Sequence, residues 1–163
     1  MLTTRTYHFS QDPSHEEFSR GKTLCLIQEA FWQIYLLKSY PDGPNSRQGE
    51  GEDLIVKVDL GSNQQLQLVS KEKRIKGKSY PAVVLGGQET QLPIVGDEHL
   101  IFLLAGGIEC IERSNDQLFS LKEGDVLRVT RSNKKKEYLN LRIRGRAERN
   151  SFIWLVIHSL SHH

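Results

Sequence analysis

The sequence has little of what marks the specialised classes of small protein. Only two cysteines, Cys25 and Cys110, occur in 163 residues, and both stand among apolar side chains. This excludes a disulfide framework and predicts buried free thiols. The formal net charge of +2 is too small to indicate a polyanion as partner of the whole molecule.

Long apolar runs are also missing. No stretch approaches the ~20 residues that a membrane-spanning helix needs. The first residues do not have the basic start and apolar core of a secretory signal. Both absences predict a cytoplasmic protein with no membrane partner. With 37% hydrophobic and 26% charged residues, the chain is expected to form one globular domain over residues 1–163.

The motifs of several common enzyme classes do not occur. The sequence contains no G-x-S-x-G, H-E-x-x-H or C-x-x-C, and no Gly-rich phosphate loop. The sequence therefore leaves open whether the protein is an enzyme.

The N-terminal part has the pattern of a helix. Asp12 or Ser14 can cap it, and Pro13 suits a first turn. Apolar residues then recur at helical spacing, namely Ile27, Ala30, Phe31, Ile34 and Leu37. The run FWQIYLL is also compatible with a strand, but the composition favours a helical segment over residues 12–38.

The chain changes character after this segment. Residues 41–53, PDGPNSRQGEGED, are rich in Gly, Pro and polar residues and predict a flexible loop. Short β-type runs then follow at near-regular spacing over residues 54–160, separated by Gly, Asn-Asp and Ser-Asn. This pattern is typical of an all-β sandwich or barrel.

Two of the expected strands carry further information. On one of them Leu141 and Ile143 alternate with Asn140, Arg142 and Arg144. The polar row faces either solvent, as one side of an antiparallel sheet commonly does, or a ligand-filled lumen. The later run SFIWLVIH is apolar on both faces, so a helix or a second subunit should cover it, which makes a homodimer an expectation.

The run IFLLAGGIECIERSNDQLFSLKEGDVLRV resembles the centre of a cupin barrel, where a strand ends in a Gly-containing turn and an L-x-x-G-D turn opens a later strand. The resemblance covers about residues 92–158, and its Gly-Gly step is similar to the HutD/Ves type. It implies a mainly β fold, a cupin-like antiparallel β-barrel or jelly roll behind an N-terminal helical segment.

Metal-binding cupins have the pattern G-x5-H-x-H-x3-4-E-x6-G followed by G-x5-P-x-G-x2-H-x3-N. Alignment of the first motif on Gly106 places His99 at the glutamate position, and its two histidine positions fall within residues 92–95, LPIV. Alignment of the second motif on Gly124 places Lys135 at the histidine position. The resemblance therefore implies no metal and no cofactor.

Cupins that lack these ligands are, as the resemblance implies, isomerases, sugar-binding sensors or structural modules. Our first hypothesis is a barrel that binds a small polar or anionic ligand without catalysis. Its candidate ligand-binding residues are Glu109, Asn140, Arg142 and Arg144, because guanidinium groups suit planar anions. The alternative is an isomerase or lyase with His99 as acid or base, although His99 could instead start a strand and face solvent.

A third hypothesis rests on basic residues. A nucleic acid or an acidic partner would bind a Lys/Arg-rich face if two loop-like stretches come together. That basic patch would consist of Lys73, Arg74, Lys76, Lys134, Lys135 and Lys136. Solvated hairpin tips explain these charges equally simply, and no aromatic residues are interleaved with them, so nucleic acid is not the favoured partner.

Overall fold

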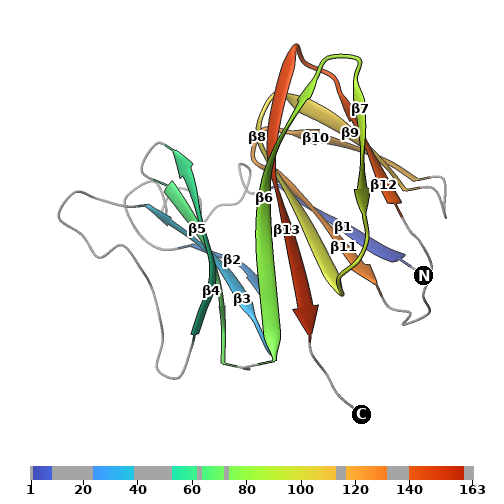
Figure 1. The fold of residues 1–163 in the computed structure, drawn as a ribbon. Helices are drawn as coiled ribbons and strands as arrows, with labels where there is room; N and C mark the ends of the chain where they lie inside the picture. Colours follow the sequence, from blue (N-terminus) through green and yellow to red (C-terminus); the bar gives the residue numbers. More distant parts are fainter. Residues whose placement is uncertain are drawn as a thin grey trace. The chain divides into compact units, whose positions relative to one another are not determined.

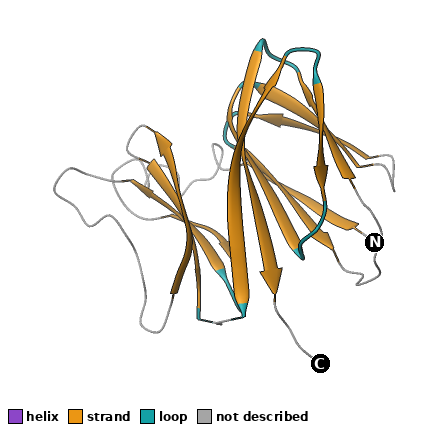
Figure 2. Ribbon diagram, viewed as in Figure 1, coloured by secondary structure: helices purple, strands orange, loops and turns teal. Residues whose placement is uncertain are grey.

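The computed structural model describes residues 2–8, 24–38, 53–61, 64–71, 74–112, 117–131 and 140–159. These residues form thirteen strands and no helix (Figure 1, Figure 2). The chain separates into two compact units. The first comprises Met1–His8 and Ser79–Ile157, and the second comprises Phe9–Lys78 and His158–His163.

A five-stranded antiparallel sheet forms one layer of the first unit, except that residues 75–78 of β6 and 158–159 of β13 belong to the second unit. Its strand order is β1-β11-β8-β13-β6. The strands are β1 (Leu2–His8), β11 (Asp125–Arg131), β8 (Glu98–Ala105), β13 (Arg149–Ser159) and β6 (Ile75–Leu85). In the centre of this sheet Ile101 pairs with Leu127 on one side and with Trp154 on the other.

A four-stranded antiparallel sheet forms the other layer of this unit, in the order β10-β9-β12-β7. Its strands are β10 (Gln117–Lys122), β9 (Gly107–Glu112), β12 (Asn140–Gly145) and β7 (Glu89–Pro93). Strand β12 alternates buried and accessible side chains, as its apolar-polar sequence predicts.

The two layers pack face to face through one apolar cluster. The five-stranded sheet contributes Ile101, Leu103, Leu127, Val129 and Phe152, and the four-stranded sheet contributes Leu92, Ile108, Cys110, Leu121, Leu141 and Ile143. Most of these side chains have no exposed surface. We call the side of each sheet that faces this cluster its inner face. The expected β fold is confirmed, as a sandwich of two sheets whose interior is filled by side chains.

Glycine is required at the turn between β8 and β9. Gly106 has a φ of +87°, which L-residues with a side chain rarely adopt. A Cβ at this position would lie 2.7 Å from the carbonyl oxygen of Arg149 and would collide with the side-chain oxygen of Asn150. Gly124, with a φ of +89°, has the same role in the turn before β11.

The second unit contains a further four-stranded sheet in the order β2-β3-β5-β4. Its strands are β2 (Leu24–Gln28), β3 (Gln33–Lys38), β5 (Gln64–Ser70) and β4 (Asp53–Gly61). The stretch expected to be one barrel, residues 54–160, is therefore divided, because β4 and β5 pair with strands from the N-terminal part. Most of the expected loop over residues 41–53 lies outside the described residues.

The expected helical segment over residues 12–38 is wrong where the structure describes it. Residues 24–38 form the hairpin of β2 and β3, closed where the Glu29 amide donates to the Trp32 carbonyl at 2.9 Å. Four consecutive side chains, Ile34 to Leu37, are at most 8% exposed. A central strand covered on both faces buries such a run, whereas an amphipathic helix would turn part of it to solvent. Residues 12–23 lie outside the described residues.

No helix that could cross a lipid bilayer occurs among the described residues.

Candidate functional site

The outer face of the four-stranded sheet, opposite the apolar cluster, carries a row of charged side chains. On β12, Leu141 and Ile143 are fully buried on the inner face. Arg142 and Arg144 alternate with them and are accessible, as is Asn140. The predicted polar row therefore faces away from the interior, so these three residues do not line a lumen between the sheets.

Glu89 on the neighbouring strand β7 binds both arginines. Arg142 Nη2 donates to Glu89 Oε2 at 2.6 Å, and Arg144 donates to Oε1 from Nη2 at 2.7 Å and from Nε at 3.1 Å. These hydrogen bonds, from Arg142 first and then Arg144, hold the pKa of Glu89 below its ordinary value. The side chains of Arg142 and Arg144 remain 27% and 48% exposed, so a second anion can reach both guanidinium groups.

The row continues on the other side of β12. Glu109 on β9 is the cross-strand neighbour of Arg144. Its carboxylate forms a longer ion pair, 3.3 Å, with Nε of Arg146. The predicted residue Glu109 thus lies on the same face as Arg142 and Arg144 and pairs with an arginine that follows the end of β12.

An open hollow of about 600 Å³ lies beside Arg146. It is bounded by Gly106 and Gly107, by residues 120–123, and by Arg146 with Ala147. Ser120 and Lys122 lie on accessible positions of β10. The hollow therefore extends the charged outer face at the end where the arginines are most exposed.

Asn150 holds the segment that forms this edge of the hollow. Its Nδ2 donates to the carbonyls of Val84 at 2.8 Å and Ala147 at 3.0 Å. Its Oδ1 accepts from the amides of Gly107 at 2.8 Å and Ala147 at 3.1 Å. The side chain has no exposed surface. It fixes the backbone of Ala147, which follows Arg146, and of Gly107, whose carbonyl accepts from the Arg146 amide at 2.9 Å.

His99 lies on the inner face and not in solvent. Its side chain is 0% exposed, and its cross-strand neighbours are Val129 and Val156. Trp154 Nε1 lies 3.0 Å from His99 Nδ1 and the Gly96 amide nitrogen lies 2.9 Å from His99 Nε2. Since a neutral imidazole has only one lone-pair nitrogen, it can accept from only one of these donors at a time. A protonated imidazole has no lone-pair nitrogen, so it could accept a hydrogen bond from neither Trp154 nor Gly96.

An ion pair lies on the other face of the same sheet. Arg128 donates to Glu98 from Nε at 2.9 Å and from Nη2 at 2.7 Å, and Thr130 Oγ1 donates to the same carboxylate at 2.9 Å. The side chains of Glu98 and Arg128 are only 11% and 12% exposed. This arrangement joins β8 to β11 and gives Glu98 a structural role.

The predicted basic patch is only partly described. Arg74 and Lys76 are exposed at the start of β6. Lys73, Lys134, Lys135 and Lys136 lie outside the described residues. The assembly of these six residues into one surface stays a prediction.

Sequence reasoning missed three residues that shape these sites. Glu89 meets Arg142 only because β7 pairs with β12, which brings together residues far apart in the chain. Trp154 reaches His99 across the β8–β13 pair, and Asn150 bridges three separate segments. The sequence around each of them offers no local motif, since their partners are set by the order of strands.

The comparisons with known proteins identify the architecture. A conserved protein of unknown function from Pseudomonas aeruginosa has a TM-score of 0.66 at 11% identity, over 98% of this chain and 100% of that chain. A cupin 2 conserved barrel domain protein from Leptotrichia buccalis has a TM-score of 0.52 at 10% identity, over 94% of this chain and 96% of that chain. The fold is cupin-like. At these identities the likeness concerns the fold alone.

Sequence comparisons add nothing to this assignment. No protein-family model matches the chain, and no curated protein matches it. The similarity to the HutD/Ves type therefore stays a resemblance.

The cupin-like fold allows the motif positions to be located. His99, at the glutamate position of the first metal motif, lies on the inner face as a lumen residue would. The histidine positions of that motif fall on a stretch where Leu92 and Ile94 are buried in the apolar cluster. Among the described residues, no three His, Cys, Asp or Glu side chains converge as a metal ion would need.

Proposed function

We propose that this cupin-like protein is a non-catalytic binding module that takes a small anionic ligand on the outer face of its four-stranded sheet. Arg142 and Arg144 would bind a carboxylate or phosphate group of the ligand, and Arg146 would provide a further cation beside the hollow. The proposal rests on the position of the Glu89 carboxylate between the two guanidinium groups. Its oxygens lie 2.6 Å from Arg142 Nη2 and 2.7 Å from Arg144 Nη2, so the two arginines bind one carboxylate together.

The interior offers less support for a ligand site. The side chains of Ile101, Leu103, Ile108 and Cys110 are all 0% exposed and belong to one cluster that joins the two sheets. A ligand between the sheets would have to displace them, and the loss of such packing costs several kcal/mol per large side chain. The accessible arginines need no such rearrangement.

Glu89 would compete with the ligand. Two arginines and one carboxylate leave one net positive charge, so a phosphate or a dicarboxylate would still be attracted to Arg142 and Arg144. Exposed ion pairs contribute little to stability. The ligand can therefore replace Glu89 at little cost, and we expect a dissociation constant for inorganic phosphate alone on the order of 1 mM.

The test is isothermal titration calorimetry with inorganic phosphate and with succinate. Arg142→Ala is expected to weaken binding about tenfold, because it removes a guanidinium that donates directly to the anion. Arg74→Ala is the matched control, since it removes the same charge from an exposed position in the other unit. Glu89→Gln is expected to strengthen binding, because the competing charge is lost.

Unchanged affinity in the Arg142→Ala protein would overturn the proposal. Equal weakening by Arg74→Ala would mean that only the net charge of the protein matters. Circular dichroism of each variant should remain that of the parent, because the side chain of Arg142 is partly exposed and its backbone stays in the ladder.

The enzyme alternative has a specific difficulty. An acid or base must lie within hydrogen-bonding reach of the substrate, and His99 has no exposed surface. A route for substrate to His99 would require movement of the surrounding core.

The homodimer also stays a prediction. That prediction was based on the two apolar faces of strand β13. This strand lies between β8 and β6 and is buried within one chain. Its burial therefore does not require a second subunit.

A further inference from the structure

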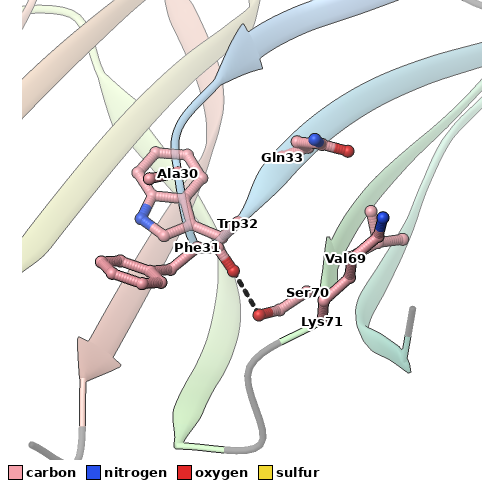
Figure 3. A pocket seen from close by; sticks show the side chains of 7 residues that line it. All are labelled: Ala30, Phe31, Trp32, Gln33, Val69, Ser70 and Lys71. Atoms are coloured by element: carbon pink, nitrogen blue, oxygen red, sulfur yellow. Dashed lines mark hydrogen bonds between the residues drawn. The ribbon is translucent and has the colours of Figure 1, made fainter. Parts of the chain in front are cut away.

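We propose a second binding site, in the unit Phe9–Lys78, that accepts a small aromatic carboxylate. It is a pocket of about 130 Å³ where the tip of the β2–β3 hairpin meets the end of β5. Residues 30–33 form one side of the pocket, and residues 69–71 form the other (Figure 3). The proposal goes beyond the proposed function, because none of these residues belongs to the unit that carries Arg142.

The walls of the pocket are held in place by the strand pairing. Gln33 on β3 is the Cα partner of Val69 on β5, so the two sides are fixed at the distance of adjacent strands. The Ser70 hydroxyl donates a hydrogen bond to the carbonyl of Phe31, as the dashed line in Figure 3 shows. Ser70 is 2% exposed. The pocket is thus a feature of the folded sheet rather than of one loop.

Two aromatic residues stand side by side at this site. Trp32 is 7% exposed, whereas Phe31 is 62% exposed at the hairpin tip. In Figure 3 both rings are turned away from Val69 and Lys71, toward the outer side of the hairpin tip. An aromatic ligand at the rim of the pocket could stack against the exposed ring of Phe31 in an offset or edge-to-face geometry and remove it from water.

The polar groups of the pocket suit a carboxylate. Lys71 follows β5 and is exposed, so its ammonium group can reach the mouth of the pocket. The Tyr35 hydroxyl donates to Gln33 Oε1 at 2.7 Å, which leaves the amide nitrogen of Gln33 to act as a donor. One cation and one neutral donor together can bind the two oxygens of a single carboxylate.

The volume limits the ligand to one ring. A cavity of about 150 Å³ has room for a benzene molecule, so a volume of about 130 Å³ admits at most one six-membered ring. Because the lining of this pocket is mainly polar, the ring would gain its apolar contact from Phe31 at the rim. A larger ring system would have to protrude into solvent.

Benzoate is the probe, and the fluorescence of Trp32 is the readout. The chain has two tryptophans, one in each unit, and Trp154→Phe leaves Trp32 as the sole reporter. Arg142→Ala is added to this background so that benzoate binds more weakly at the other site. We expect saturable quenching with a dissociation constant on the order of 1 mM, as befits a ligand of this size.

Two variants and two analogues test the chemistry. Phe31→Ala should weaken benzoate binding roughly tenfold, and Lys71→Gln should weaken it roughly two- to fivefold. Lys76→Gln, which removes an exposed cation of the same unit, should leave the affinity unchanged. Benzamide should bind more weakly than benzoate because it lacks the charge, and acetate should bind more weakly because it lacks the ring.

Unsaturable quenching of Trp32, or equal affinity in the parent and Phe31→Ala proteins, would overturn the inference. Equal affinity for benzoate and benzamide would overturn its carboxylate component. These results are separable from those on the proposed function, because they are read from a different unit in a protein whose Arg142 is already removed.

Discussion

Substitution of Asn150 by alanine is expected to destabilise the first unit strongly. The amide makes four hydrogen bonds to backbone groups of three segments, at 2.8 to 3.1 Å, and the side chain is fully buried. A typical hydrogen bond contributes about 0.5–1.5 kcal/mol net, so four would contribute about 2–6 kcal/mol. Water can reach part of this turn, because Gly106 and Arg146 are exposed, and we expect a loss of about 3 kcal/mol.

Asn150→Asp separates hydrogen bonding from packing. The aspartate keeps the shape, but it replaces the two donors that face the carbonyls of Val84 and Ala147 by an oxygen. An anionic oxygen against two carbonyl oxygens is repulsive, so we expect this variant to be at least as unstable as Asn150→Ala at neutral pH. A smaller effect of Asn150→Asp than of Asn150→Ala would contradict the assigned orientation of the amide.

The assay is urea unfolding followed by the fluorescence of Trp154 in a Trp32→Phe background, which reports on the first unit. With slopes of about 1–3 kcal/mol per M urea for small proteins, a loss of about 3 kcal/mol lowers the midpoint by about 1–3 M. Asn140→Ala, an exposed asparagine of the same unit, is the matched control and should change the midpoint little. Equal midpoints for Asn150→Ala and Asn140→Ala would refute the reasoning.

Three further predictions concern charged groups and thiols. The prediction of buried thiols holds for Cys110 and is wrong for Cys25, which is exposed. Burial raises the pKa of Cys110 to about 12, so in the native protein at pH 8 a thiol reagent should modify Cys25 and should reach Cys110 only in urea. Modification of both cysteines in the native protein would contradict the burial of Cys110. Glu98→Gln should lower the free energy of unfolding by about 3 kcal/mol, measured by thermal or urea unfolding, because the charge of Arg128 loses its buried counter-charge. A change below about 0.5 kcal/mol would argue against a stabilising Glu98–Arg128 pair. The lowered pKa of Glu89 means that its contribution to stability is present above its ordinary pKa and is lost as the pH falls through the folded-state value. The protection factors of the β7 amides, which are exchange rates corrected for the intrinsic effect of pH, should therefore fall in acid in the parent protein and stay constant in Glu89→Gln.

The strand content after residue 54 could be predicted because apolar and polar residues alternate there. Leu141 and Ile143 lie on the inner face and Arg142 and Arg144 on the outer face, as the period of two requires. The same reasoning could not tell whether the polar face turned toward a lumen, because alternation defines two faces without saying which of them is enclosed. That is decided by Leu103 and Ile108, which fill the interior from opposite sheets.

The N-terminal hairpin shows a different limit. The apolar residues from Ile27 to Leu37 recur at the spacing of a helix. Two buried strands that are separated by a short turn at Ala30 and Phe31 produce the same apolar pattern. The distinguishing feature is the continuous burial from Ile34 to Leu37, which depends on strands β2 and β5 on either side. Residues distant in the sequence also determine the composition of the candidate site. Glu89 meets Arg142 and Arg144 because of the register in which β7 pairs with β12.

The most direct test of the central claim is an NMR titration with inorganic phosphate that follows the arginine Nε–Hε signals and the methyl groups of Leu, Val and Ile together. We expect saturable shifts of the Arg142 and Arg144 signals, while the methyl groups of Leu103 and Ile108 in the interior remain unchanged. Shifts centred on these interior methyl groups, with no change at Arg142 or Arg144, would contradict a binding site on the outer face and would place the ligand between the sheets.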